Sequence, residues 1–229
     1  MIRPARPEDA PQAAYLMYLS GPSFALTILG GPESHAIGVL RKLFPIPNHL
    51  YSHTYAFVAE AKGKVVGLFL GFDRKEWEAA RRAMGRELGF RWFKIVRPWH
   101  LPRVIPPLLD LARTFEPLSD EDYLIQMLAV LPKVRRRGIA TRLIEFAAER
   151  ARSKGLKRLV LDVLIENEGA RRFYERMGFR AVKTVTDPRF CRRFGVRGSI
   201  RMAKPLGVGR CRDGAGEAFQ GAACLSAGV

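Results

Sequence analysis

A basic turn that contains one glycine is the segment best suited to holding a phosphorylated ligand. It reads KVRRRGIA over residues 133–140, between an apolar run that predicts a buried strand and a stretch with helical spacing. The first turn of a helix has backbone N–H groups without partners and a partial positive charge, so it attracts phosphate. Gly138 would let the backbone approach the anion closely, and Thr141 adds a hydroxyl in the first turn.

Two familiar phosphate-binding motifs do not fit this turn. The Lys-Ser/Thr ending of a P-loop is missing, and so is the three-glycine spacing of a dinucleotide fingerprint. A basic helix start on a solvated surface is the alternative interpretation. The strands and helices expected around the turn therefore have to distinguish a phosphate site from a basic helix start on the surface.

Other reactive residue types form no competing pattern. The three cysteines contain no CxxC pair and fit no zinc site, and no Gly-x-Ser-x-Gly supports a serine hydrolase. The four histidines lack metal or triad spacing; they are His35, His49, His53 and His100. We therefore expect no metal site.

The elements that must position the turn follow from the apolar periodicity. Expected strands cover residues 1–4, 55–60, 65–70, 123–130, 159–164, 179–186 and 199–203. A capping signal at Asp9 predicts a helix through residue 19, and further helices are expected at 33–43, 75–88, 139–154 and 169–177. Gly21-Pro22 is interpreted as punctuation after the first helix. The strand–helix–strand unit over 123–164 implies a parallel or splayed strand pair.

The charge of the chain is unusual, whereas its composition is that of a globular protein. Its 229 residues are 48% hydrophobic, and 39 Lys+Arg against 22 Asp+Glu give a net charge of +17. Such a field attracts polyanions, although a solvated basic surface is an equal alternative. The cysteine usage and the lack of an apolar leader favour a cytoplasmic setting. No run approaches the roughly 18 apolar residues of a membrane span.

Two motifs together resemble the GNAT superfamily of N-acetyltransferases. Residues 130–140 resemble its motif A, a Gln/Arg-x-x-Gly-x-Gly/Ala turn after a strand, and residues 167–179 resemble its motif B. The resemblance covers about residues 1–206. It implies an α/β (α+β) fold with a mixed, mostly antiparallel sheet of six to seven strands, a splayed parallel pair at the CoA site and flanking helices.

The resemblance also implies site residues and a donor, acetyl-CoA, used without a metal. Three backbone positions of the strand before the turn would bind the pantetheine arm: Leu128, Ala129 and Val130. The turn would bind the pyrophosphate through Arg135, Arg136, Arg137, Gly138, Ile139, Ala140 and Thr141. Asn167 matches a CoA-contacting position, and Tyr174 matches the general acid beside the sulfur. The expected reaction is direct attack of a primary amine on the thioester.

The general base is left open. Many relatives carry a carboxylate in the strand before motif A, but residues 123–127 read YLIQM, and Gln126 cannot act as a base. Five other carboxylates are candidates, each of which is more readily a solvated side chain: Glu33, Asp120, Glu121, Asp122 and Glu166.

A basic insertion and a tail complete the predicted organisation. Residues 73–118 form the insertion, and the Gly/Ala-rich residues 207–229 are expected to be disordered. Arginines alternate with Trp92, Phe93 and Trp99, so a non-catalytic CoA-fold module that binds RNA, a ribosome or an anionic surface is the alternative function. Core packing of these aromatic residues is the favoured interpretation, so nucleic acid is the less favoured partner. A homodimer is a further possibility that the resemblance raises.

Overall fold

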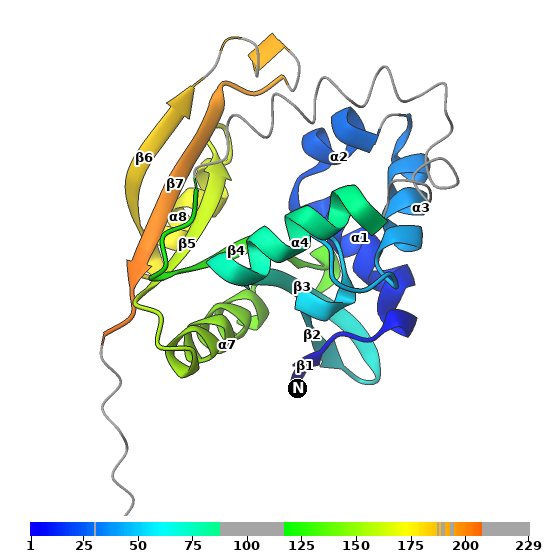
Figure 1. Ribbon diagram of the computed structural model, residues 1–229, viewed down its shortest axis with the longest axis horizontal. Coiled ribbons are helices and arrows are strands. Elements are labelled where there is room, and N and C mark those ends of the chain that lie inside the picture. The colour runs from blue at the N-terminus through cyan, green and yellow to red at the C-terminus, as the bar shows by residue number, and fades with distance from the viewer. Residues whose placement is uncertain (30, 88–116, 187, 189–190, 193–194, 208–229) are drawn as a thin grey trace, which may run out of the picture.

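One seven-stranded sheet runs through the protein. The computed structural model describes residues 1–29, 31–87, 117–186, 188, 191–192 and 195–207. The strand order is β1-β2-β3-β4-β5-β7-β6 (Figure 1). The strands are β1 (Ile2–Pro4), β2 (Ala56–Ala61), β3 (Lys64–Asp73), β4 (Asp122–Val130), β5 (Arg158–Leu164), β6 (Arg180–Thr186) and β7 (Gly198–Pro205). Every neighbouring pair is antiparallel except β4–β5, so the predicted fold class is confirmed.

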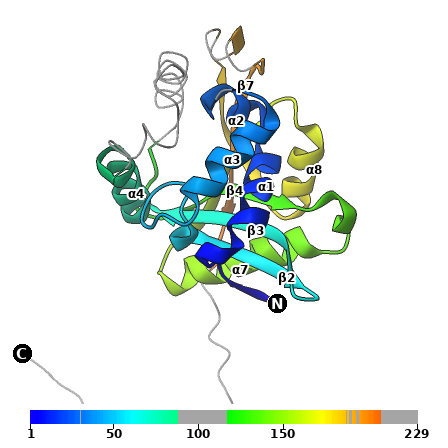
Figure 2. The same ribbon diagram turned by 90° about the vertical axis from the view of Figure 1, so that its right-hand side faces the viewer.

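Helices cover both faces of the sheet. They are α1 (Ala10–Ser20), α2 (Pro22–Leu29), α3 (Glu33–Leu43), α4 (Arg74–Glu87), α7 (Ile139–Ser153) and α8 (Glu168–Arg176). Figure 2 shows α1, α2 and α3 on one side of β2 and β3 and α7 on the other. Two large apolar cores result, one beneath α1 and α3 and one beneath α7, where α8 also packs, and a smaller cluster includes Leu124 and Val160.

Helix α2 was not expected, because Gly21-Pro22 was interpreted as an interruption of the chain. The structure places Pro22 at the first position of α2. Proline is tolerated there, since its missing N–H would have no partner in the helix and its φ is already near the helical value. The same residues therefore end one helix and begin the next.

The predicted splay between β4 and β5 is confirmed. Their parallel register holds for only three residue pairs: Asp122↔Arg158, Tyr123↔Leu159 and Leu124↔Val160. Beyond them β4 continues along β3 as far as Val130, and β5 continues along β7 as far as Leu164. The two strands diverge, and their facing backbone groups become available to a ligand.

Asp9 stands at the N-cap of α1, where its sequence position predicts a capping residue. Its carboxylate makes no capping bond to α1. It accepts hydrogen bonds from the Arg3 guanidinium at 2.8 and 2.9 Å and from the Arg6 N–H at 2.8 Å. These bonds join β1 to the start of α1, and the Arg3 hydrogen bond is the main cause that holds the pKa of Asp9 below its ordinary value.

Replacement of Asp9 by asparagine is expected to lower the free energy of unfolding by about 1–3 kcal/mol at pH 7, because the largely buried Arg3 guanidinium loses one of its two carboxylate partners and keeps only Glu60. The lowered pKa means that this stabilisation is present above the unfolded value of about 3.9 and is lost as pH falls through the folded value. Urea unfolding at pH 7 and pH 3 should show a difference between wild type and Asp9→Asn that shrinks in acid. The exposed Asp120→Asn is the control; an Asp9→Asn difference as small as that of the control at pH 7 contradicts the prediction.

Helix α4, expected at 75–88, is held against the end of α7. Lys154, which follows α7, contacts Asp73 at 2.6 Å and also contacts Glu76 at the start of α4. The rest of the predicted insertion, residues 88–116, lies outside the described residues, as does the tail from 208 on. In the part that the structure describes, no helix is both long and apolar enough to cross a membrane.

Candidate active site

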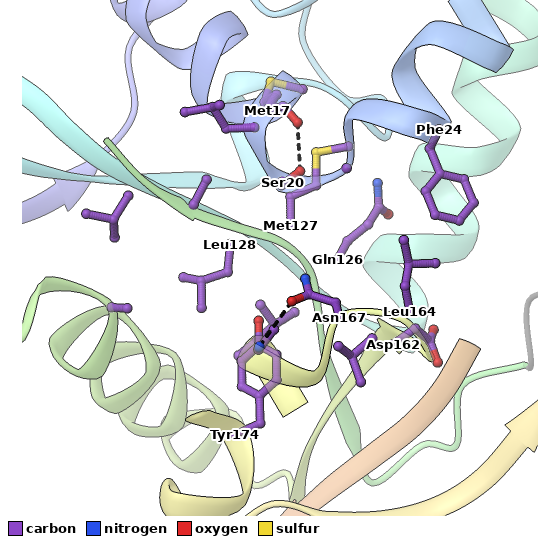
Figure 3. A pocket seen from close by; sticks show the side chains of 18 of the residues that line it. Met17, Ser20, Phe24, Gln126, Met127, Leu128, Asp162, Leu164, Asn167 and Tyr174 are labelled. Carbon is purple, nitrogen blue, oxygen red and sulfur yellow. Dashed lines mark hydrogen bonds between the residues drawn. The ribbon is translucent and has the colours of Figure 1, made fainter. Parts of the chain in front are cut away.

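A cavity of about 1130 Å³ opens where β4 and β5 separate. This volume exceeds the roughly 300–1,000 Å³ of a typical single small-molecule site, so there is room for two substrates. The cavity extends from the turn after β4, past α8 and the splayed strands, to α1, α2 and α4. Figure 3 shows its centre, with Tyr174 and Phe24 at opposite ends of the labelled side chains.

The basic turn forms one end of this cavity. After the single turn η4 (Pro132–Val134), Arg136 and Gly138 adopt positive φ values of 63° and 72°. Gly138 immediately precedes α7, and the first helical bond runs from the Arg142 N–H to the Gly138 carbonyl at 3.0 Å. No side chain caps this end of α7, so the N–H groups of residues 139–141 have no partner within the helix.

Most of the predicted donor-site residues meet at this cavity. Residues 128–130 of β4 line it, and so do Arg135, Arg136 and residues 138–141. Arg135 also donates to the Val130 carbonyl at 3.2 Å, which ties the turn to the end of β4. Arg137 is the exception, because it is not among the residues that line the cavity. In a tight turn with two positive φ values, neighbouring side chains point in different directions.

Helix α8 brings Asn167 and Tyr174 to the same cavity. They lie seven residues apart, which is two helical turns, so both face the same way. Asn167 is the N-cap of α8: its Oδ1 accepts the Ala170 N–H at 3.1 Å (Figure 3). Asn167 was predicted only as a position that contacts CoA, and its capping bond to the Ala170 N–H was not predicted.

Tyr174 sits in an apolar setting. Its ring packs edge-on against Phe179, with centroids 5.7 Å apart, and also contacts Phe173. Burial raises the pKa of Tyr174 to about 12. The phenol is therefore neutral at physiological pH and retains the proton that an acid catalyst needs.

None of the five carboxylates considered as bases lines the cavity. Asp120, Glu121, Asp122 and Glu166 are engaged by basic side chains, which are Arg74, Lys157, Arg158 and Arg197 in turn. Glu33 accepts a hydrogen bond from the Tyr18 hydroxyl at 3.1 Å.

A different carboxylate, Asp162, does line the cavity. It lies on β5 opposite Arg201 of β7, and the guanidinium holds it with two bonds of 2.8 and 2.7 Å. Asp162 was not among the candidate bases predicted from sequence. The signal was present as a lone acid in the apolar strand LVLDVL, since a charge within a buried strand requires a partner or a role.

Comparison with known proteins agrees with the fold and the site. The sequence model of the acetyltransferase (GNAT) family matches residues 31–179, so the chain belongs to this family. N-alpha-acetyltransferase 30 of Schizosaccharomyces pombe is 40% identical over 61 residues, which are 27% of this chain and 41% of that protein. The chain thus spans well under half of this curated relative.

Two solved structures share the fold. An N-acetyltransferase from Staphylococcus aureus Mu50 superposes with a TM-score of 0.67 at 22% identity, covering 89% of this chain and 99% of that one. The PaiA N-acetyltransferase of Thermoplasma acidophilum, solved with coenzyme A, has a TM-score of 0.50 at 13% identity over 90% and 98% of the two chains. The resemblance drawn from the two motifs is therefore confirmed at the level of the family.

Proposed function

We propose that this acyl-CoA-dependent acetyltransferase transfers an acetyl group from acetyl-CoA to a primary amine by direct attack. The observation that carries the proposal is the arrangement of one cavity. An uncapped helix start suited to phosphate lies at one end, a splayed strand pair borders the middle, and the half-buried, neutral Tyr174 lies beside it.

The residues fit acetyl-CoA by the chemistry of their donors. The N–H groups of residues 139–141 would bind the pyrophosphate, helped by the charges of Arg135 and Arg136. The β4 backbone at 128–130 would bind the amides of the pantetheine arm, because the splay leaves its outer edge without a strand partner. The PaiA N-acetyltransferase of Thermoplasma acidophilum, which shares the fold, was solved in complex with coenzyme A.

The chain's groups would then divide the reaction between them. The amine nitrogen attacks the thioester carbonyl, and a backbone N–H near Leu128 donates a hydrogen bond to the oxygen as it gains negative charge. The C–S bond breaks, and Tyr174 gives its proton to the sulfur. A phenol with a pKa near 12 is a weaker acid than a thiol of about 8.5, so this transfer has to accompany C–S cleavage and not follow it.

Asp162 is our candidate for the group that handles the amine proton, because it is the one carboxylate among the described residues that line the cavity. Its bonds to Arg201 keep it in place, and its remaining lone pairs can accept a proton directly or through water. An ammonium must lose a proton before it can attack, and an adjacent anion both attracts it and assists that loss.

The Asp162→Asn variant is expected to lower kcat/KM for the amine by roughly 10²-fold at pH 7. The loss should diminish as pH rises toward 10, because more of the amine is then already unprotonated. Glu166→Gln, which removes a carboxylate outside the cavity, is the control and should change little. An equal loss at all pH values would contradict a role in deprotonation.

Calorimetric titration of the wild-type protein with acetyl-CoA tests the proposed donor. Micromolar binding that falls with salt is the expected result, because phosphate contacts to a basic turn are screened. A folded protein that does not bind acetyl-CoA would overturn the proposal.

A further inference from the structure

The half of the cavity that the donor would leave empty is strongly apolar. It lies beyond Asp162, where α1, α2, α4 and the start of β4 meet. Side chains of this half include Met17, Phe24, Ile28, Leu29, Trp77 and Met84.

Apart from the phenol of Tyr51, the polar side chains of this half are already hydrogen-bonded or lie at its margin. The Ser20 hydroxyl donates to the Met17 carbonyl at 2.7 Å, and the Gln126 amide donates to the Leu50 carbonyl at 3.3 Å. The Arg81 guanidinium lies over the Trp77 ring, 5.1 Å from its centroid. Among the described lining residues, Asp162 at the inner end is the only anion.

From these lining side chains we propose that the acceptor is a primary monoamine carried on an apolar body. This inference rests on the proposed acetyl transfer and names its acceptor class. The amino group would lie near Asp162 and Gln126, and the apolar body would lie among the side chains of α1, α2 and α4. Burial of such a body in this wall supplies binding energy in proportion to its area.

The direction of attack assigns the apolar half of the cavity, called the apolar chamber from here on, to the acceptor and not to the acyl chain. Tyr174 packs in the core beneath α7, whereas Met17, Ile28 and Leu29 belong to the core beneath α1 and α3. The sulfur must lie near Tyr174 to receive its proton, while the amine attacks a face of the planar thioester and reaches it from the side of the cavity that the donor does not fill. That side is the apolar chamber.

A second cation on the acceptor is disfavoured in two ways. The net charge of +17 repels polycations at long range, and Arg81 adds a positive charge to the chamber wall. Within the chamber a second ammonium would lose its water without an anion to replace it. Acceptors with several amino groups therefore bind poorly.

Two matched amines test the inference on the wild-type protein. Hexylamine and hexamethylenediamine share a six-carbon chain, and the diamine carries an ammonium group on the sixth carbon, which is the terminal methyl group of hexylamine. We expect kcat/KM, measured by thiol release from acetyl-CoA, to be at least about 100-fold higher for hexylamine. From butylamine to hexylamine it should rise about fourfold per methylene. Equal use of the two amines, or preference for the diamine, would overturn the proposal.

A further arm distinguishes small amines from peptides as the source of this chemistry. Two peptides that differ only in a first residue of leucine or aspartate present an apolar or an anionic body beside the same α-amine. The leucine peptide should be acetylated faster; equal rates combined with slow turnover of hexylamine would overturn the proposal. Octanoyl-CoA is the test for an acyl-chain chamber, and a preference for it over acetyl-CoA, whatever the amine, would also overturn the inference.

A negative charge placed among the side chains that line this half should weaken the preference for hexylamine over the diamine. Ala25 of α2 lines this half of the cavity, so Ala25→Asp gives the second ammonium of the diamine an anionic partner. We expect the variant to reduce the ratio of kcat/KM for hexylamine to kcat/KM for the diamine at least tenfold. Thr27→Asp adds the same charge to the same helix outside the lining residues and should leave the ratio unchanged. If Ala25→Asp and Thr27→Asp changed the kcat/KM ratio of the two amines equally, the assignment of the acceptor to this part of the cavity would be contradicted.

Binding measurements separate this inference from the proposed function. Hexylamine should bind the CoA-saturated protein at least tenfold more tightly than the diamine, even if turnover is slow. Binding of CoA without this difference would overturn the acceptor class alone, whereas absence of acetyl-CoA binding would overturn the acetyltransferase proposal itself.

Discussion

The Gly138→Glu variant is expected to bind acetyl-CoA at least about 100-fold more weakly than wild type. A carboxylate about 5 Å from a phosphate interacts unfavourably by roughly 3 kcal/mol at an effective dielectric constant of 20. The space around a Cβ at Gly138 is open, so the substitution does not disturb packing and its effect falls on the ligand. Calorimetric titration of both proteins at one moderate salt concentration measures the difference.

Gly155 provides a closely matched control for this experiment. It lies just beyond the opposite end of α7, its φ is +73° against +72° for Gly138, and its Cβ would also meet open space. Gly155→Glu therefore carries the same backbone strain of about 1–2 kcal/mol without approaching the phosphate site. If the two variants lose affinity equally, the turn at Gly138 is not the phosphate site.

The second large effect is expected from Tyr174→Phe, which should lower kcat by roughly 10²–10⁴-fold while leaving acetyl-CoA affinity within about twofold. The substitution removes only the hydroxyl, so the ring contacts with Phe173 and Phe179 persist. Because the pKa of Tyr174 is about 12, its ionisation should not limit the wild-type rate below about pH 10. Single-turnover thiol release measures the effect on the chemical step, and calorimetric titration measures the effect on acetyl-CoA affinity separately.

Tyr51→Phe is the matched control, since Tyr51 also lines the cavity but lies toward the acceptor side. Burial raises the pKa of Tyr51 as well, so a raised pKa alone does not distinguish the two phenols. A loss of kcat for Tyr51→Phe as large as that for Tyr174→Phe, or an unchanged kcat for Tyr174→Phe, would contradict the acid role of Tyr174.

The donor half of the site was predictable from sequence because its parts are close together in the chain. The strand at 122–130, the turn at Gly138 and the start of α7 are contiguous, and local rules for helix ends fix their geometry. Tyr174 was assigned through the resemblance of residues 167–179 to motif B, a contiguous segment in which Asn167 caps the helix that carries Tyr174. The hairpin of β2 and β3 was found for the same reason.

The acceptor half was not predictable, because contacts between distant segments create it. Phe24, Trp77 and Asp162 come together only when α2, α4 and β5 have packed. Asp162 seemed unremarkable in sequence because its partner, Arg201, lies on a strand that pairs with β5 much later in the chain. Asp9 was predicted correctly as the residue before the first helix, but the local capping rule did not predict that its carboxylate would be bonded to Arg3.

Some predictions concern residues that lie outside the described part of the chain. The RNA or anionic-surface alternative depends on Trp92, Phe93 and Trp99, and all three lie within residues 88–116. The disordered tail and the homodimer also stay predictions. The cavity residues used in the acetyl-transfer proposal all belong to the described part of the chain, so that proposal can be tested first.

The most direct test follows the acetyl group itself. Wild-type protein is incubated with acetyl-CoA labelled in the acetyl group and a panel of monoamines, polyamines and peptides, and the products are separated. The account predicts that label appears in an amide product in step with free CoA, and that Tyr174→Phe slows both together. A folded wild-type protein that leaves all label on CoA with every amine would contradict it.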